Sequence, residues 1–408
     1  MLKIAPFKAI LPREDLIEVV SSENYDAQNK HLSIEKMRQN SLSYLHISKP
    51  HLNFPEEKKN VERHFPIALA KLEHFLADGI LEKKENHIYI YRQVKDGRIY
   101  HGVIAGVHAD DYASEKIKKH EHTRTDKEDE MLGQMRITKT VGTAVLVTYH
   151  KTSAIEILTL KEMEGKPHFD IVQHGIRHTL WVVKNESQLC EALASLENVY
   201  IADGHHRSAS LVRYANEQKE LNLNHTGLEA YNYLQTYFVP SDLIHVVEYN
   251  RLVDGIVNYP YKILRHLHDH FEVEKKKKEE AYHPKKKHCF GMYYIDTWYK
   301  LKAKAEIIDD SDPLKSLDVQ ILEDFLLGPV LNITDSKTDE RLSFVDGTKG
   351  LALLEDRVNK GKADIAFTLF PTEMEQVMAV ADLGATMPPK STWIEPKMRT
   401  GFLVQDLS

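Results

Sequence analysis

The chain has 408 residues, of which 42% are hydrophobic and 28% are charged, and its formal net charge at pH 7 is −7. These values are typical of a globular protein with two or three domains, each large enough to bury its own core. The acidic balance argues against a protein that attaches broadly to nucleic acid or to anionic lipid.

The cysteines and the N-terminal segment indicate the cellular compartment in which the protein is expected. Cys190 and Cys289 lie far apart and in no paired motif, which excludes a disulfide framework or a zinc ribbon and favours a reducing environment. The segment Met1–Phe7 lacks the apolar run of a signal peptide, and no segment reaches membrane-spanning length. We therefore expect a soluble, cytoplasmic protein without a membrane partner.

Hydrophobic periodicity and turn residues predict the elements of the first half of the chain. Asp96–Gly97 is a strong hairpin signal between alternating segments within 87–108. The charged run 111–137 predicts one or two helices with a polar face. The other predicted elements are a helix over 56–81 interrupted near Pro66, strands at 141–148, 155–160 and 179–183, a helix over 186–196, a strand that ends at Asp203 and a helix over 206–220.

The second half of the chain predicts a similar mixture. Its elements are strands at 231–239 and 244–247, a helix near 259–271, strands at 288–295 and 298–304, helices over 313–327 and near 347–360, a strand at 363–370 and a helix over 372–382. This alternation indicates an α+β fold with mixed α/β sheets. We expect an N-terminal α/β region over 1–110, a core over 111–250 and a C-terminal α/β region over 251–408.

The most informative segment is the junction at Asp203, where an apolar strand stops at Asp-Gly and a helix opens with His-His-Arg. A helix N-terminus has unpaired N–H donors and about half a positive charge, so it suits a phosphate. Glycine permits close backbone approach, and arginine offers a planar fork for phosphate oxygens. The candidate phosphate-binding residues are Gly204, His205, His206, Arg207 and Ser208. The alternative is a structural turn in which Asp203 caps the helix.

Asp203 does not fit a simple phosphate cradle, because its carboxylate repels phosphate. It must hold a histidine or arginine in place, bind a metal, or act as a base. Asp203 is therefore a candidate catalytic residue.

The segment Ile117–Glu130 crowds titratable side chains together. On a helix, one side of this segment could present a histidine, a threonine and a lysine. The candidates are His120 and Thr123 for ligand binding and Glu121 for catalysis. The alternative is a solvated helix face with ion pairs. His120 and His122 are spaced wrongly for joint ligation from a helix, so no metal site is predicted.

The second unusual segment, Met387–Gly401, contains three prolines, which fix an extended, non-helical path. We expect this strap to return to the core. Its candidate ligand-binding residues are Lys390, Ser391, Thr392 and Lys397. The alternative is a structural strap that packs Trp393 and Met398 against the body of the protein.

The lysine-rich stretch 275–287 raises the question of nucleic-acid binding. Glutamates intervene among the lysines, no aromatic stacking pattern accompanies them, and the whole chain is acidic. We interpret the stretch as an exposed loop between a helix and a strand, and expect no nucleic-acid partner.

At three places the chain resembles a large uncharacterised prokaryotic family of similar length, known as a domain of unknown function. The matching segments are Lys119–Thr123 with Lys127 and Asp129, Tyr200–Arg207, and Met387–Thr392 with Glu395–Lys397 and Thr400–Gly401. Gly175–Trp181 is a weaker fourth match. Together the matches span most of the chain in the family's order.

The Asp-Gly-His-His-Arg segment is also similar to the phosphate-binding motif of the ParB/sulfiredoxin superfamily. Its members include the CTP-binding partition protein ParB, the ATP-using sulfiredoxin and an archaeal kinase that phosphorylates free serine. This resemblance implies a ParB/sulfiredoxin-like core and a nucleotide, ATP, ADP or CTP, as cofactor. The free-serine kinase shares the Asp-Gly-His motif and is the nearest chemical analogy. Sulfiredoxin chemistry needs a cysteine before the histidine, where this chain has Gly204 or His205, and is therefore excluded.

The leading hypothesis is a small-molecule phosphotransferase. Backbone N–H groups, His206 and Arg207 would hold phosphates. Asp203 or Glu121 would orient or deprotonate the accepting hydroxyl, and lysines of the strap would neutralise transferred charge. Mg²⁺ would assist as in most phosphoryl transfer, although the sequence shows no ligand set for it.

Two other functions stay open. The first is a ParB-like, nucleotide-switched binding module without metabolic turnover, which should carry a helix-turn-helix and a basic face. The second is a site for a phosphate metabolite that is not a nucleotide. The expected partners are a nucleotide and a small hydroxyl-bearing substrate, and a homo-oligomer is compatible with the sequence.

Overall fold

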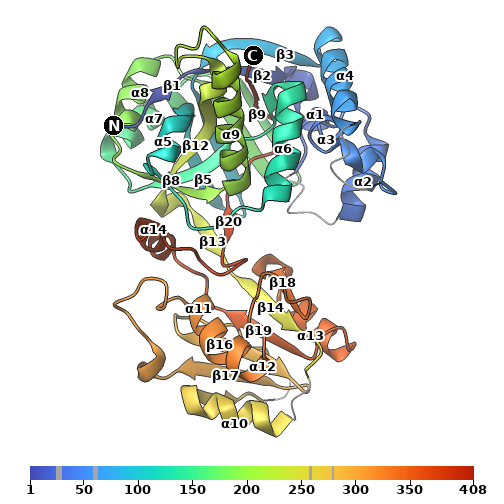
Figure 1. Ribbon diagram of the computed structural model, residues 1–408, viewed down its shortest axis with the longest axis vertical. Helices are drawn as coiled ribbons and strands as arrows, with labels where there is room; N and C mark the ends of the chain where they lie inside the picture. The colour runs from blue at the N-terminus through green and yellow to red at the C-terminus, as the bar shows by residue number, and fades with distance from the viewer. Residues whose placement is uncertain (24–29, 58–62, 257–259, 278–279) are drawn as a thin grey trace. The chain divides into compact units, whose positions relative to one another are not determined.

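The computed structural model describes residues 1–23, 30–57, 63–256, 260–277 and 280–408. Parts of the predicted helices at 56–81 and 259–271, and of the lysine-rich stretch, lie outside these ranges. The chain divides into two compact units, Met1–Ile244 with Pro396–Ser408, and His245–Glu395 (Figure 1). Both units contain helices and sheets, which confirms the mixed α/β fold class.

The first unit is built around a nine-stranded sheet in the order β6-β11-β8-β12-β5-β4-β10-β9, with β1 beside β5. Its strands are β1 (Ile4–Ala5), β4 (Tyr89–Lys95), β5 (Arg98–His108), β6 (Ile117–Lys118), β8 (Val145–Tyr149), β9 (Phe169–Gln173), β10 (Ile176–Val182), β11 (Val199–Asp203) and β12 (Tyr233–Pro240). The pairs β12–β8 and β11–β6 are parallel and the others are antiparallel. The expected boundary near residue 110 runs through this sheet, because β5 pairs with β12.

A smaller sheet of the first unit has the order β3-β2-β21-β7. Its strands are β2 (Phe7–Pro12), β3 (Leu81–His87), β7 (Thr140–Val141) and β21 (Val404–Asp406). Because β21 pairs with both β2 and β7, the segment after Pro396 is an integral part of the first unit.

The helices of the first unit cover these sheets. They are α1 (Ile17–Val20), α2 (Lys30–Gln39), α3 (Leu45–Ser48), α4 (His64–Ala77), α5 (Ala109–Ala113), α6 (Thr125–Thr138), α7 (Ser153–Met163), α8 (Glu186–Ala194) and α9 (His205–Leu221). Helices α7 and α8 bury Ile155 and Leu189 against sheet residues such as Val147. Helices α6 and α9 lie side by side, and Leu132 and Leu211 share a second core cluster (Figure 1).

Several predicted elements are confirmed, among them the Asp96–Gly97 hairpin, the strand that ends at Asp203 and the helix that follows it. One prediction is wrong, and a second is correct only in part. Residues 155–160 are helical, within α7, because Ile155 and Thr159 are buried one turn apart. The charged run 111–137 is helical at its two ends, in α5 and α6, but not between them, because Ile117–Lys118 pairs with β11. Pro66 lies in the first turn of α4, where proline is tolerated.

The second unit has a six-stranded sheet in the order β15-β17-β16-β19-β14-β18 and a two-stranded sheet, β13-β20. Its strands are β13 (His245–Val247), β14 (Tyr249–Val253), β15 (Phe271–Lys275), β16 (Cys289–Tyr294), β17 (Trp298–Ala303), β18 (Leu342–Asp346), β19 (Ile365–Leu369) and β20 (Trp393–Glu395). Its helices are α10 (Pro260–His270), α11 (Asp318–Leu322), α12 (Gly328–Leu331), α13 (Leu351–Asn359) and α14 (Met374–Asp382). A π-helical turn, Glu323–Leu327, joins α11 to α12.

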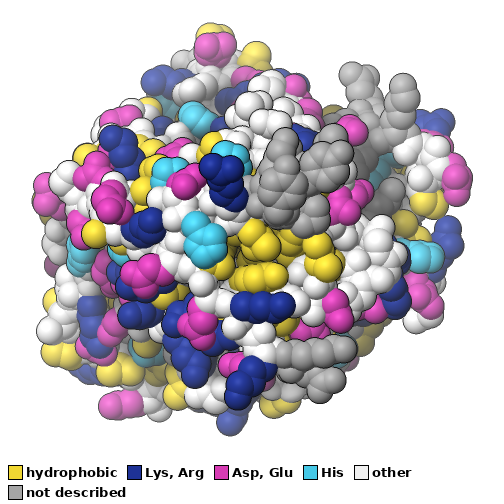
Figure 2. All heavy atoms as spheres, turned by 90° about the horizontal axis from the view of Figure 1, so that it is seen from below, with side chains coloured by type: hydrophobic (Ala, Val, Ile, Leu, Met, Phe, Trp, Pro, Cys, Tyr) yellow, Lys and Arg dark blue, Asp and Glu magenta, His cyan; other side chains and the backbone are white. Residues whose placement is uncertain are grey.

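Lysines of the second unit are paired with acidic residues across neighbouring strands. Lys302 lies 2.9 Å from Glu272, and Lys300 lies 3.3 Å from Glu274. On the face shown in Figure 2, basic and acidic side chains are interspersed. Such pairing suits a solvated surface better than a phosphate-binding one. Over the described part of the chain, no helix combines the length and the apolar character needed to cross a membrane.

Candidate functional site

The junction between β11 and α9 is built by its local sequence. Residues 199–202 are buried, and Tyr200, Ile201 and Asp203 pair with β8, whereas the side chain of Asp203 keeps a small exposed fraction at the end of the strand. Gly204 then adopts φ +108°, a backbone conformation that strains residues with a Cβ. A Cβ at this position would also lie 3.2 Å from the guanidinium carbon of Arg207. The glycine therefore allows both the sharp turn and the close approach of Arg207.

The carboxylate of Asp203 is held by two cations. Arg207 Nη2 donates to Oδ2 at 2.7 Å, and Lys397 Nζ donates to Oδ1. All three side chains are largely buried, with exposed fractions of 15% to 25%. Burial raises the pKa of Asp203, but the positive charges of Lys397 and Arg207 outweigh this effect and hold the pKa well below its usual range. Asp203 is thus a stable anion and a weak base.

Arg207 also braces the turn that precedes β8. Its Nη1 donates to the carbonyl oxygen of Thr143 at 3.2 Å and to that of Ala144. The guanidinium group therefore links β11, α9 and this turn. Two positive charges, Arg207 and Lys397, face one negative charge, Asp203, so these three side chains together carry a net charge of +1 beside the positive end of α9. The arrangement is suited to an anion.

His205 and His206 contact a segment that precedes α6. The rings of His205 and His120 are both buried and meet edge to face, with centroids 4.5 Å apart. His205 Nδ1 lies 3.8 Å from Glu121 Oε2. The backbone N–H of His120 donates to His205 Nε2 at 3.5 Å, and that of Arg124 donates to His206 Nε2 at 3.1 Å. Burial lowers the pKa of His120 to about 4 and that of His205 well below its usual range.

The predicted helix face around His120 is not formed, because residues 119–124 have no regular secondary structure. The parallel pairing of β6 with β11 carries this segment to the first turn of α9 instead. His120 and Glu121 therefore contact His205 from an irregular segment, and not from the predicted helix face. Thr123 is partly buried within the same segment.

Ser208 differs from the other predicted ligands. Its side chain is fully buried, its hydroxyl donates to the Gly204 carbonyl at 3.2 Å, and its backbone N–H donates to the same oxygen. Both donors of Ser208 are therefore used within the helix.

The predicted residues of the strap divide between the two units. Lys397 belongs to the first unit, whereas Lys390, Ser391 and Thr392 belong to the second. The Ser391 hydroxyl donates to the Pro388 carbonyl at 2.6 Å, and Lys390 Nζ lies 5.4 Å from the centroid of the Tyr249 ring. Thr392 is partly buried. The structure thus brings Lys397 to Asp203 and gives Lys390 and Ser391 local contacts within the second unit.

Arg399, which is 5% exposed, was not among the residues predicted from the sequence. Its Nε donates to the Ser21 hydroxyl at 2.9 Å, and its Nη2 donates to the Ser21 carbonyl at 2.6 Å. The available signal was its spacing from Lys397, because residues i and i+2 of an extended segment share one side. The carbonyl acceptors of Arg207 were also missed, and backbone groups leave no sequence signal.

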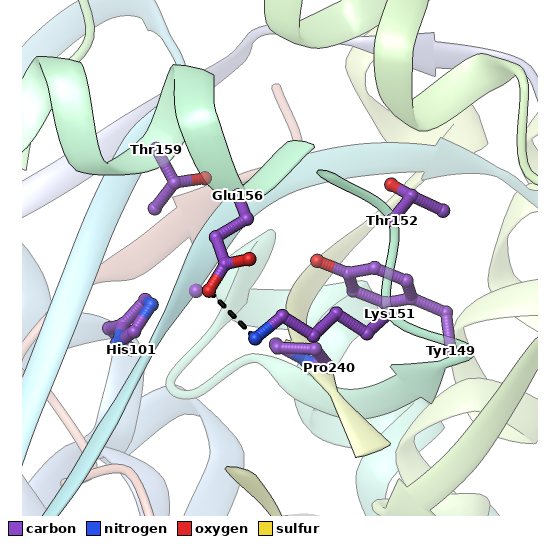
Figure 3. A pocket seen from close by; sticks show the side chains of 8 residues that line it. His101, Tyr149, Lys151, Thr152, Glu156, Thr159 and Pro240 are labelled. Atoms are coloured by element: carbon purple, nitrogen blue, oxygen red, sulfur yellow. Dashed lines mark ion pairs between the residues drawn. The ribbon is translucent and has the colours of Figure 1, made fainter. Parts of the chain in front are cut away.

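A small cavity elsewhere in the first unit is not lined by these residues. Figure 3 shows it between His101, Tyr149, Lys151 and Glu156, with Lys151 Nζ 2.7 Å from Glu156 Oε1. Its volume of about 10 Å³ corresponds to about one water molecule. It is too small for a nucleotide. Within the described ranges, no group of three or more His, Cys, Asp or Glu side chains is arranged to hold a metal ion.

The fold and the site define a mixed α/β protein with a clamped aspartate and two histidines at a helix N-terminus. The chain belongs to the family described as "Protein of unknown function (DUF1015)", whose model matches residues 4–320. Membership of an uncharacterised family is thereby confirmed. The search of curated proteins gave no match.

Solved structures that are similar to the chain include the following three. A free serine kinase in complex with AMP is 14% identical with a TM-score of 0.36, over 72% of this chain and 87% of the kinase. A conserved hypothetical protein from Pyrococcus furiosus is 15% identical with a TM-score of 0.34, over 72% and 90% of the two chains. SbnI with C-terminal truncation from Staphylococcus aureus is 13% identical with a TM-score of 0.37, over 72% and 82%. Because the identities are 15% or less and the TM-scores are below 0.5, these similarities do not establish a function, and the function must be argued from the site itself.

Proposed function

We propose that the first turn of α9 binds the phosphates of a nucleotide, and that the protein transfers the terminal phosphoryl group to a small hydroxyl-bearing acceptor. The observation that carries the proposal is the net charge of +1 from Lys397, Arg207 and Asp203 at the positive end of a helix. The nucleotide, ATP, ADP or CTP, comes from the resemblance of the Asp-Gly-His-His-Arg motif to the ParB/sulfiredoxin superfamily.

In the proposed reaction, the acceptor oxygen forms a bond to the terminal phosphorus while the bond from that phosphorus to the bridging oxygen breaks. The shortened nucleotide leaves with the bridging oxygen. Glu121 receives the acceptor's proton, because the cations beside Asp203 make that carboxylate a weak base. Asp203 instead fixes Lys397 and Arg207 where negative charge develops. Mg²⁺, when bound with the nucleotide, would neutralise further phosphate charge.

Ligand-induced stabilisation tests the binding step. Thermal unfolding of the full chain is measured with ATP, ADP, CTP and GTP, each with and without Mg²⁺. A ligand that binds the folded state raises the unfolding midpoint, and we expect at least one nucleotide to do so. Arg207→Ala should abolish the increase. Arg213→Ala is the matched control, because Arg213 lies on the same helix but pairs with Glu128 and Asp129 instead of Asp203.

If no nucleotide raises the unfolding midpoint of the wild-type protein, the proposed phosphate site is wrong. It is also wrong if a nucleotide raises the midpoint of Arg207→Ala as much as that of Arg213→Ala. If a nucleotide binds, an assay of nucleotide consumption with serine and other small hydroxyl compounds tests turnover. Binding without turnover would favour the nucleotide-switched module over the phosphotransferase.

A further inference from the structure

The segment His120–Arg124 is attached to α9 at both of its ends. It connects β6 to α6 and has no regular secondary structure of its own. The N–H of Arg124 donates to His206 Nε2 at 3.1 Å, an ordinary hydrogen-bond length. The N–H of His120 donates to His205 Nε2 at 3.5 Å, which is a longer and weaker contact. Two adjacent histidines of α9 thus hold the two ends of one segment.

The contacts assign the protonation of both rings. An imidazole nitrogen that accepts a hydrogen bond carries no proton, so Nε2 of each histidine is unprotonated. The proton of neutral His205 then lies on Nδ1, the atom that faces Glu121 at 3.8 Å. Consecutive helical side chains point about 100° apart, so His205 and His206 can reach two separate points of the segment.

We infer that His205 and His206 are positioning residues, which accept backbone N–H groups of the segment His120–Arg124 and so hold Glu121 at the first turn of α9. The two histidines are then not phosphate ligands, and their acceptor nitrogens explain why histidine occupies both positions. The part of this inference that concerns Glu121 as a base rests on the proposed function. The attachment of the segment does not.

The role of His206 as a hydrogen-bond acceptor has a specific test, because glutamine can replace histidine in that role. In His206→Gln, the side-chain amide oxygen can occupy the place of Nε2, whereas His206→Ala removes the acceptor. Hydrogen–deuterium exchange of the full chain without any ligand is followed at the backbone amide of Arg124. One lost hydrogen bond of about 1 kcal/mol corresponds to about fivefold faster exchange in His206→Ala. His206→Gln should restore the slower rate.

Arg124→Ala is the matched control. It removes a side chain whose guanidinium contacts Asp126 but keeps the backbone N–H that donates to His206. Exchange at position 124, corrected for the intrinsic rate, should stay slow in this variant. Unchanged exchange in His206→Ala, in a protein whose other amides remain protected, would overturn the inference. Failure of His206→Gln to slow the exchange would also overturn it.

The same variants separate this inference from the proposed function. With ADP or inorganic pyrophosphate as probe, His206→Ala should bind more weakly than His206→Gln if the segment completes the anion site. If neither probe binds the wild-type protein while the exchange results hold, the proposed function fails and the attachment of the segment stands.

Discussion

Lys397 and Asp203 form an ion pair across 194 positions of the chain. Lys397 contacts Oδ1 while Arg207 contacts Oδ2, so each carboxylate oxygen has its own cation. Lys397 lies in the segment Pro396–Ser408, which rejoins the first unit after the whole second unit. The carboxylate therefore couples the helix N-terminus to the last segment of the chain.

The first prediction concerns this ion pair. Lys397→Met leaves the largely buried Asp203 with one cation, and we expect the free energy of unfolding to fall by about 1–3 kcal/mol. Urea denaturation at pH 7 measures the change. The control is Lys3→Met, which breaks a long-range pair with Asp110 whose side chains are more than half exposed and should cost little. Equal losses in the free energy of unfolding would show that the ion pair of Asp203 and Lys397 stabilises the fold no more than an exposed ion pair does.

The second prediction concerns the anion site. Asp203→Asn removes the negative charge that opposes a phosphate, so the net charge of the three side chains at positions 203, 207 and 397 rises from +1 to +2. We expect the affinity for inorganic pyrophosphate to rise by about tenfold, which corresponds to about 1.4 kcal/mol, and to become more sensitive to salt. Isothermal titration calorimetry at two salt concentrations measures both effects. Asparagine keeps one side-chain oxygen that can accept a hydrogen bond from Arg207 or Lys397, so the two cations stay in place in this prediction. Weaker binding by Asp203→Asn would contradict it, and would show that the loss of orientation outweighs the gain in charge.

The junction at Asp203 was predictable because its signals are local. An apolar run, an Asp-Gly pair and a following polar-apolar pattern predict strand, turn and helix without knowledge of distant residues. The same reasoning failed at residues 155–160. Ile157 and Leu160 are exposed there, so apolar residues on the outer face of α7 hid its helical period.

The composition of the site was only partly predictable for a different reason. Asp203, Arg207 and Lys397 were each candidates, but no local pattern pairs residues that are 194 positions apart. The histidines were assigned to phosphate, because nothing in the sequence shows that their partners are the backbone N–H groups of His120 and Arg124. Residue type therefore predicted which side chains matter, and tertiary pairing decided what each one contacts.

The third prediction separates backbone strain from steric contact at Gly204. Gly204→Ala places a Cβ in a left-handed conformation and 3.2 Å from the Arg207 guanidinium, so we expect a loss of about 1–3 kcal/mol in stability. Gly175→Ala is the control, because Gly175 also has a positive φ, +77°, but no atom within 4 Å of the added Cβ. Thermal or urea unfolding of both variants gives the comparison. A smaller loss for Gly204→Ala than for Gly175→Ala would argue against a tightly packed turn.

The last prediction concerns acid stability and His120. Burial lowers the pKa of His120 from 6.5 to about 4, so the unfolded chain binds a proton near pH 6.5 that the folded chain binds only near pH 4. Unfolding therefore takes up a proton between these values, and stability falls as pH falls through this window while it is unaffected above it. The shift corresponds to about 3 kcal/mol in total. Asp203 contributes little to the pH dependence of stability between pH 6.5 and pH 4. Its pKa lies well below this window in the folded state and near 3.8 in the unfolded chain.

Urea unfolding at several pH values between 7.5 and 4.5 measures this dependence. In His120→Gln the free energy of unfolding should fall less steeply towards low pH, by a slope that corresponds to up to one proton. This difference in slope does not depend on how much stability the variant loses at pH 7.5. Equal slopes in the wild type and in His120→Gln would show that His120 accepts its proton in the folded protein as readily as in the unfolded chain. The buried contact between His120 and His205 would then have to open at mildly acidic pH.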